Sequence, residues 1–326
     1  MAKRALKNNG LSLIELMPVI VILALSAVGV GGIISTSSKV FMDVSTRDEL
    51  ISSVRFSVER LNREVRYALP NSVRVYNLLE GSPVEDLFQE GIVKCLEYIP
   101  TLGSTVYLDV PVIPEVADTL LTVIRFDESV FFDERFLQGE VHAVVNPLKA
   151  EQVYDTIANP ITGLTDSTST RRYRLNLSGI SKVGKIIDNL WTMNLVEKAL
   201  FAENSPTKRL YLVNQPVAYC ASANQLTRYT GYGFAGVPFN NNNDPLVAVN
   251  GEPLVDNNGE PLLNNNGELF SGTGVTMAEG IEISETFFAV QEASDINNTL
   301  IDITLKFSKN DETLTFFNQV QVLNVP

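Results

Sequence analysis

Residues 10–36 read GLSLIELMPVIVILALSAVGVGGIIST, and this stretch decides how the rest of the chain is interpreted. From Leu11 to Ile34 every residue is apolar apart from Ser12, Glu15 and Ser26. As a helix this stretch would extend over about 36 Å, which is long enough to cross the hydrocarbon core of a bilayer. No later part of the chain matches its length and apolarity, so the sequence predicts one membrane span.

The charges before this stretch predict its orientation. Lys3, Arg4 and Lys7 precede it, and no acidic residue lies among them. Positively charged flanks of membrane helices remain in the cytoplasm. We therefore expect everything after Ile34 to lie outside the cytoplasm.

An ordinary secretory signal peptide is the first alternative for this segment. Ala24, Ser26 and Ala27 resemble the small residues of a cleavage site on the far side of an apolar core. Two features disfavour it: the apolar stretch is too long, and Glu15 lies inside it. A carboxylate within a membrane helix costs free energy, so Glu15 needs a functional reason.

Residues 10–15, GLSLIE, resemble the prepilin signature of type IV pilins and type II secretion pseudopilins. In that family a short basic leader ends in Gly, and Glu is the fifth residue of the mature chain. The resemblance implies that a prepilin peptidase cuts between Gly10 and Leu11 and that the new amine of Leu11 is methylated. It also implies that Glu15 meets the N-terminal amine of a neighbouring subunit, since opposite charges attract strongly in apolar surroundings. Phe is usual where this chain has Leu11.

The helix is predicted to continue beyond the membrane as far as Leu69 and to end at Pro70. Apolar residues recur there at three- and four-residue spacing and form one stripe: Ile51, Val54, Val58, Leu61, Val65 and Ala68. The opposite face carries oppositely charged pairs four residues apart: Arg55–Glu59, Glu59–Arg63 and Arg60–Glu64. We therefore expect a transmembrane and assembly helix at 11–36 and an amphipathic helix at 37–70, whose stripe a sheet must cover.

Residues 71–326 are rich in short apolar runs separated by Gly, Pro, Asn or Ser, which is the pattern of β-strands. The predicted strands are Val93–Ile99, Thr105–Val110, Leu120–Phe126, Glu140–Val145, Arg172–Leu177, Arg209–Val213, Val217–Ala221, Gln225–Tyr229, Thr286–Gln291, Leu300–Phe307 and Thr313–Leu323. Ser308–Asp311, between the last two runs, has the composition of a hairpin turn. Ile187–Phe201, which carries the single Trp, is expected to be a helix. The prediction is an α+β fold in which the long N-terminal helix packs on an antiparallel β-sheet with a large C-terminal body.

Further segments resemble the MshO family of minor pilins, which belongs to the mannose-sensitive haemagglutinin (MSHA) pilus. They are residues 60–74 (RLNREVRYALPNSVR), 91–97 (GIVKCLE), 216–220 (PVAYC) and 324–326 (NVP). The resemblance implies a pilin-like fold and a minor pilin of the initiation or tip complex. The implied partners are prepilin peptidase, other major and minor pilins, and the inner-membrane assembly platform. The implied location is the inner membrane, with one span and a periplasmic body, and then a pilus or pseudopilus on the cell surface.

Three alternatives to this interpretation remain open at the level of sequence. One alternative is a minor pseudopilin of type II secretion, which shares the signature at residues 10–15. A tip subunit of the adhesin type would use the large body to bind a surface ligand. A signal-anchored periplasmic protein unrelated to pili would not need cleavage after Gly10.

The chain has two cysteines, Cys95 and Cys220. Because the body is expected to lie outside the cytoplasm, where disulfides persist, we predict that they are bonded to each other. The chain-entropy model gives roughly 4–5 kcal/mol as an upper figure for closing such a long loop. The alternative is a pair of buried free thiols.

A repeat of period eight marks the region from 240 to 270, where NGEPL at 250–254 recurs at 258–262. Asn-Gly favours tight turns, so we predict an exposed insertion of short turns. The alternative to solvated turns is a calcium site formed by Asp244, Asp256 and neighbouring Asn and Glu oxygens, although the spacing matches no EF-hand loop. We expect no cofactor and no metal site elsewhere, because the chain has one His and no CxxC.

Charge and motif content disfavour two other classes of function. The formal net charge of −13 would repel nucleic-acid phosphates, so no nucleic-acid partner is expected. No GxSxG, HExxH or Walker sequence is present, and His142 is the one histidine available for a catalytic triad or dyad. The carboxylates at 127–134 have the pattern of a solvated loop. We therefore predict that the chain is not an enzyme.

Overall fold

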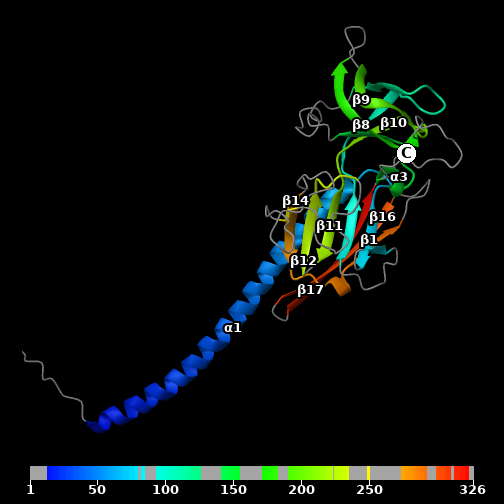
Figure 1. The fold of residues 1–326 in the computed structure, drawn as a ribbon. Coiled ribbons are helices and arrows are strands. Elements are labelled where there is room, and N and C mark those ends of the chain that lie inside the picture. Colours follow the sequence, from blue (N-terminus) through cyan, green and yellow to red (C-terminus); the bar gives the residue numbers. More distant parts are fainter. Residues whose placement is uncertain are drawn as a thin grey trace, which may run out of the picture. The chain divides into compact units, whose positions relative to one another are not determined.

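The computed structural model describes most of the chain in separate ranges: 13–79, 82–84, 93–125, 141–154, 171–182, 190–222, 224–234, 248–249, 273–291, 299–309 and 312–322. The chain divides into two compact units, 1–52 and 53–326. Helix α1 (Leu13–Arg66) has 54 residues and supplies the described part of the first unit and the beginning of the second (Figure 1). The predicted long helix is confirmed, and it ends a few residues earlier than expected.

The second half of α1 packs against a seven-stranded sheet. Its strands follow the order β13 (Ala248–Val249), β14 (Thr273–Glu279), β12 (Gln225–Thr230), β11 (Val217–Ser222), β3 (Val93–Tyr98), β1 (Arg74–Leu79) and β2 (Ser82–Val84). Neighbours are antiparallel except for β13 and β14, which are parallel. The sheet therefore places β11, from the C-terminal half of the chain, beside β3 from the N-terminal half.

The predicted apolar stripe of α1 is buried from Val54 to Ala68, including Val58, Leu61 and Val65. Ser57 is buried with them, and its hydroxyl oxygen lies 2.6 Å from the carbonyl oxygen of Met277 in β14. The apolar periodicity thus places the correct face of the helix on an antiparallel sheet, as expected for an α+β fold.

A three-stranded antiparallel sheet follows near the C-terminus. It has the order β15 (Phe287–Gln291), β16 (Thr299–Lys309) and β17 (Glu312–Val322), with the short 3₁₀ helix η2 (Ile283–Glu285) before it. Strands β16 and β17 pair over their whole length, from Thr299 opposite Val322 to Lys309 opposite Glu312. This confirms the predicted hairpin. The side-chain amide of Asn318 in β17 donates to Asn62 of α1, so the helix also contacts this sheet.

The remaining strands form a closed six-stranded barrel, which the sequence did not predict. Around the ring they are β5 (Asp118–Ile124), β4 (Thr101–Asp109), β10 (Arg209–Val213), β6 (His142–Val145), β8 (Arg174–Lys182) and β9 (Leu190–Phe201), and β9 pairs with β5 to close it. The short β7 (Arg171–Arg172) pairs with the end of β9. A closed barrel of this kind is not a clear feature of the pilin fold.

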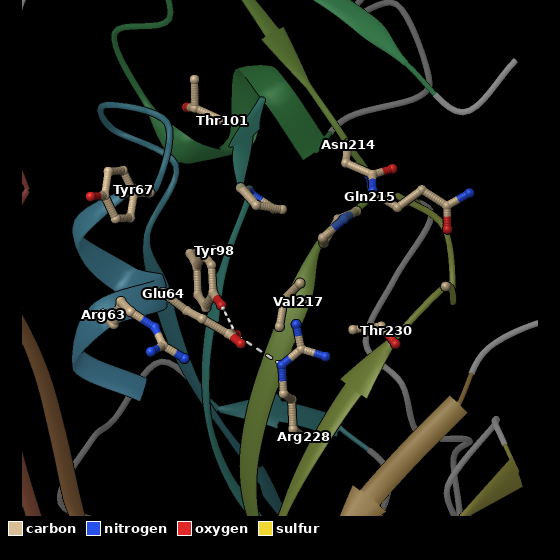
Figure 2. A pocket seen from close by; sticks show the side chains of 13 residues that line it. Arg63, Glu64, Tyr67, Tyr98, Thr101, Asn214, Gln215, Val217, Arg228 and Thr230 are labelled. Carbon is tan, nitrogen blue, oxygen red and sulfur yellow. Dashed lines mark hydrogen bonds and ion pairs between the residues drawn. The ribbon is translucent and has the colours of Figure 1, made fainter. Parts of the chain in front are cut away.

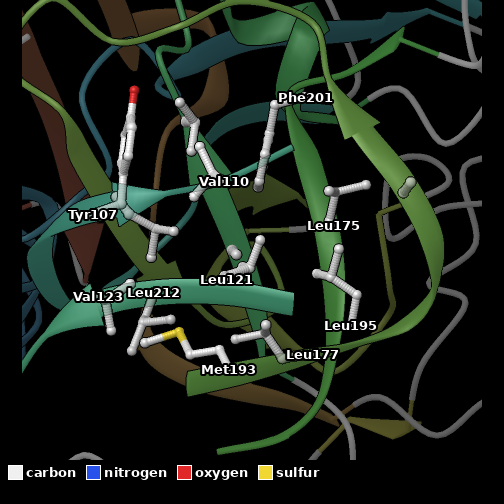
Figure 3. Close-up of a cluster of buried hydrophobic side chains, with 14 of the residues drawn as sticks. Tyr107, Val110, Leu121, Val123, Leu175, Leu177, Met193, Leu195, Phe201 and Leu212 are labelled. Carbon is white, nitrogen blue, oxygen red and sulfur yellow. The ribbon is translucent and has the colours of Figure 1, made fainter. Parts of the chain in front are cut away.

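Side chains fill the interior of the barrel (Figure 3). The buried cluster includes Leu121, Met193, Leu177, Leu212 and Phe201, drawn from four different strands. A barrel with few strands has room inside for little more than its own side chains. The interior is therefore a hydrophobic core.

The predicted helix at Ile187–Phe201 is wrong, because its described part, from 190 onward, is strand β9. Trp191, Met193 and Leu195 are buried, while the residues between them are only partly buried. This alternation has the period of two that belongs to a strand. The helix-favouring residues at 196–200 obscured it, and pairing with both β5 and β8 decides the structure.

A second hydrophobic cluster connects the barrel to the large sheet. It contains Leu69 after α1, Ile99 between β3 and β4, Val144 of β6, Tyr211 of β10 and residues of helix α3 (Ala150–Tyr154).

The Cys95–Cys220 disulfide lies within the large sheet. The two cysteines are directly opposite each other on β3 and β11, with Cα atoms 4.1 Å apart. The predicted disulfide is confirmed.

Candidate functional site

The first candidate is the apolar surface of the first half of α1. Among the described residues this is the one helix long and apolar enough to cross a membrane, with a mean hydropathy of 2.5 over its most apolar window. None of that window is buried, and Val28, for example, is 78% exposed. Such a surface is expected to be covered by lipid or by other protein. The helix therefore fits a membrane anchor or a signal segment.

Several residues predicted to be functional lie wholly or partly outside the residues that the structure describes. Gly10 and Leu11 lie outside the described residues. Glu15 falls in the first turn of α1, but its side chain is outside the description as well. Of the predicted insertion at 240–270, the structure describes only β13, so both calcium-site candidates, Asp244 and Asp256, lie outside the described residues. The carboxylates at 127–134 lie outside the described residues as well.

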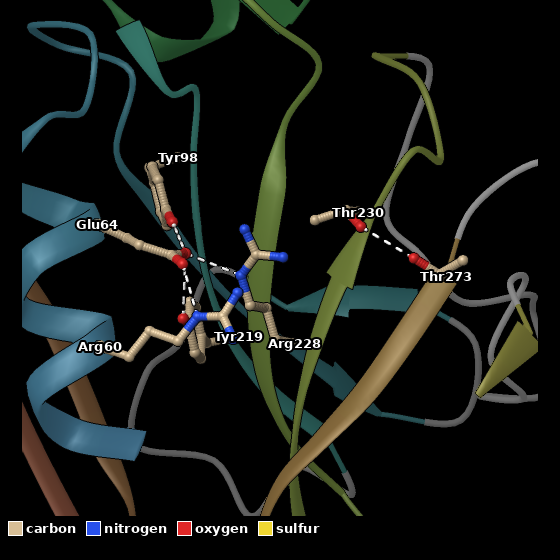
Figure 4. Close-up of polar contacts among 7 residues, drawn as sticks. All are labelled: Arg60, Glu64, Tyr98, Tyr219, Arg228, Thr230 and Thr273. Carbon is tan, nitrogen blue, oxygen red and sulfur yellow. Dashed lines mark hydrogen bonds and ion pairs between the residues drawn. The ribbon is translucent and has the colours of Figure 1, made fainter. Parts of the chain in front are cut away.

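The second candidate is a polar cluster around Glu64, near the end of α1 (Figure 4). Its carboxylate accepts hydrogen bonds from Arg60 Nε at 2.8 Å, Arg228 Nε at 2.8 Å, Tyr98 Oη at 2.7 Å and Tyr219 Oη at 3.1 Å. Three strands, β3, β11 and β12, thus supply donors to one helical side chain.

Electrostatics in this cluster favour an ionised Glu64. Burial alone would raise the pKa of Glu64, but the hydrogen bonds to its carboxylate outweigh burial and hold the pKa below the usual 4.5. Burial also opposes the charge on Arg228, yet the hydrogen bond to Glu64 raises the pKa of Arg228 further. Burial, together with the carboxylate charge, raises the pKa of Tyr98 well above 10, so this tyrosine remains a hydrogen-bond donor.

A pocket of about 620 Å³ opens beside this cluster (Figure 2). Its walls come from the end of α1, the β3–β4 connection, the β10–β11 connection and strand β12. The volume lies in the range of small-molecule sites, which is roughly 300–1,000 Å³. Arg63 and Arg228 bring two guanidinium groups to the lining, and Glu64 is the one carboxylate among the lining residues.

One contact of this site was predicted from the sequence, but the position of Glu64 facing the sheet was not. The predicted pair of Arg60 and Glu64 is present, but Glu64 was placed on the charged outer face of the helix. The predicted Arg55–Glu59 pair is also present and is solvent-exposed. The expected pairing of Glu59 with Arg63 does not occur, and among the described residues Arg63 has no ion-pair partner.

Another carboxylate, that of Glu97 in β3, is fully buried and has a structural role. Arg74 donates to it from the opposite position on β1, and Tyr232 donates at 2.6 Å. Burial raises the pKa of Glu97, although the charge of Arg74 acts in the opposite direction. The interaction connects two neighbouring strands of the large sheet.

His142, the one candidate for histidine-dependent catalysis, is buried in β6. Its Nδ1 lies 3.2 Å from a guanidinium nitrogen of Arg174, and its ring packs edge to face against Phe234. Burial, and then the charge of Arg174, lower the pKa of His142 to about 3. The imidazole is therefore neutral across the physiological range and sits among packing groups.

Within the described ranges, no group of three His, Cys, Asp or Glu side chains is arranged to hold a metal ion. Comparison with known proteins gives no matching family model, curated protein or solved structure.

Proposed function

We propose that this chain is a minor subunit of a type IV pilus-like filament, of the MshO type found in MSHA pili. A prepilin peptidase removes the leader after Gly10. The first half of α1 holds the mature chain in the inner membrane, with the body in the periplasm. The inner-membrane assembly platform then transfers the subunit into a filament with other major and minor pilins, where it acts at initiation or at the tip. The proposed role is structural and not enzymatic.

The observation that carries this proposal is the contrast between the two halves of α1. Residues 14–44 of the helix expose their large apolar side chains, whereas the stripe from Val54 to Ala68 is buried. An exposed apolar helix fits lipid before assembly and fits the helices of neighbouring subunits afterwards. One continuous helix, 54 residues long, then serves both as the anchor and as part of the folded body.

Glu15 supplies the second argument. It would be the fifth residue of the chain that begins at Leu11, and the next acidic residue is Asp43. A carboxylate in this setting is costly unless a cation compensates it. The amine created at Leu11 by cleavage is such a cation, and in a filament the amine of a neighbouring subunit is another.

The size of the body favours a minor subunit over the repeated major one. In addition to a helix on an antiparallel sheet, it carries the barrel and a three-stranded sheet. A bulky body is most easily accommodated where few neighbours surround it, as at a filament tip. A type II secretion minor pseudopilin would meet the same requirements, and an adhesin-like tip subunit would also use the large body.

Mass spectrometry of the full-length protein extracted from membranes tests the proposal. We expect an N-terminus at Leu11 that carries one methyl group. An intact Met1 or a cut beyond Ala27 would reject the proposal in favour of a signal anchor or a secretory signal peptide.

Assembly is tested separately with Glu15→Ala. We expect normal processing after Gly10 but a large loss of the protein from sheared filaments, because the carboxylate that compensates a neighbouring amine is gone. The matched control is Glu59→Ala, which removes a carboxylate from the same helix whose side chain is 72% exposed. If Glu15→Ala enters filaments as efficiently as the control, the role assigned to Glu15 is wrong.

A further inference from the structure

The pocket beside Glu64 is positively charged in a strongly acidic chain. The formal net charge of the protein is −13, yet two arginines and one glutamate line this pocket. The negative charge of Glu64 is already neutralised, since both Arg60 and Arg228 donate to its carboxylate. Arg63 therefore adds a positive charge that no neighbouring carboxylate offsets in the described part of the chain.

Both guanidinium groups of the lining retain hydrogen-bond donors for a ligand. Arg228 uses Nε to bind Glu64, and its terminal nitrogens lie on the side away from that carboxylate (Figure 2). Arg63 is exposed at the pocket and has no ion-pair partner among the described residues. A guanidinium carries five N–H donors in a planar fork, a geometry that matches a carboxylate.

The neutral part of the lining combines one exposed aromatic ring with hydroxyl and amide groups. Tyr67 is 70% exposed at the pocket. Asn214, Gln215, Thr101 and Thr230 contribute polar side chains. Within the described chain, the hydroxyl of Thr101 and the side-chain oxygen of Gln215 are buried without a hydrogen-bond partner. Because these two atoms are closed to solvent, they are not among the groups that a ligand in the open pocket would contact.

We propose that this pocket binds an acidic saccharide, whose carboxylate pairs with Arg63 and Arg228 and whose ring lies against Tyr67. A ligand rich in hydroxyl groups matches the amide and hydroxyl groups of the lining. An aromatic ring at the rim provides an apolar surface with a polar tip for the face of the sugar. This assignment does not depend on assembly into a filament, and it stands or falls independently of cleavage after Gly10.

An acidic peptide is the ligand that the pocket fits less well. Peptide sites draw most of their affinity from large apolar or aromatic anchors in desolvated pockets. The aliphatic lining here is limited to Val217 and two prolines, Pro100 and Pro216. The two arginines and the amide groups dominate the chemistry, which favours a small polyhydroxylated anion.

The test measures binding of galacturonate and of galactose, its neutral counterpart, to the full-length protein in detergent by saturation-transfer NMR and calorimetry. We expect galacturonate to bind at least about tenfold more tightly than galactose, since a charge-assisted pair with arginine distinguishes them. The preference should weaken as salt is added. Arg63→Gln should remove most of it, and this variant should fold normally because Arg63 is exposed and has no ion pair to lose in the described structure.

Arg66→Gln is the matched control, because it removes one exposed arginine from the same last turn of α1 but outside the pocket lining. It should keep the preference for galacturonate. Equal binding of the two sugars, an equal effect of the two variants, or no saturable binding of galacturonate would each overturn the proposal. Binding of a glutamate-rich peptide without binding of galacturonate would overturn the saccharide assignment.

Discussion

Removal of the Glu64 carboxylate is the perturbation whose effect the structure defines best. In Glu64→Ala, Arg228, Tyr98 and Tyr219 lose the acceptor that they share. Breaking a buried ion pair by removing one partner costs about 3–5 kcal/mol. The Glu64 side chain is 20% exposed and that of Arg60 31%, so water partly replaces what is lost. We therefore expect the free energy of unfolding to fall by about 3 kcal/mol.

Glu64→Gln keeps the shape and one acceptor oxygen but removes the charge, and we expect a smaller loss of about 1–2 kcal/mol. Urea titration followed by far-UV circular dichroism and by the fluorescence of Trp191 measures both variants, and the two probes should give coincident transitions. Glu59→Ala is the control, with an expected effect below about 0.5 kcal/mol because its ion pair is exposed. A loss below about 1 kcal/mol in Glu64→Ala would refute the reasoning.

The same network predicts a pH dependence. The folded-state pKa of Glu64 lies below the usual 4.5, so its contribution to stability is fully present above that pH and is lost as the pH falls through the folded-state value. The stability difference between the wild type and Glu64→Gln should therefore be constant near neutral pH and shrink below about pH 4.5. Glu97, whose pKa is raised, acts in the opposite sense, but it is present in both proteins and cancels in the difference.

Three further predictions concern other parts of the body. Replacing Cys95 and Cys220 by Ser should lower the free energy of unfolding by at most about 4–5 kcal/mol, measured in urea against the oxidised wild type; an unchanged midpoint would contradict the role of the disulfide. Gly280→Ala should lower the free energy of unfolding by about 2 kcal/mol or more, because φ is +84° and the new Cβ would lie 2.5 Å from a backbone carbonyl oxygen of β16. Gly233→Ala is the control: its φ is +81°, but the space around its Cβ is open, so the loss should be smaller. Equal losses in the two glycine variants would show that the close approach is relieved easily. The imidazole NMR signals of His142, the single histidine, should show no titration between pH 7 and 5, because burial lowers its pKa to about 3. The free energy of unfolding should decrease as the pH falls below 6.5, because the unfolded chain then takes up a proton that the buried ring does not.

The helix and most strands were predictable because their signals are local. The apolar stripe of α1 identifies its buried face, and short apolar runs between turn residues identify strands such as β10 (Arg209–Val213), which matches its prediction residue for residue. The disulfide was also predictable, since two cysteines allow only one pairing and the body was expected to lie outside the cytoplasm. Strands β1 and β14 were missed, because neither Arg74–Leu79 nor Thr273–Glu279 shows a strong apolar alternation.

The barrel could not be predicted because its closure depends on contacts between distant strands. β5 pairs with β4, its neighbour in the chain, but also with β9, and in that second pairing Leu121 lies opposite Met193. No local pattern specifies which strand will complete such a ring. The pocket was missed for the same reason, since its walls join residues from 63 to 231.

Two adjacent residues of α1, Arg63 and Glu64, have different roles because they point in different directions from the helix. Consecutive residues of a helix differ in direction by about 100°, since 3.6 residues complete one turn. Glu64 reaches donors on β3, β11 and β12 and thereby fixes how the helix is seated on the sheet. Arg63, one residue earlier, lines the pocket without an ion-pair partner in the described chain. Arg228 belongs to both groups, because its Nε neutralises Glu64 while the rest of its guanidinium borders the pocket. The carboxylate that stabilises the fold therefore also holds one of the two cations proposed to bind the ligand.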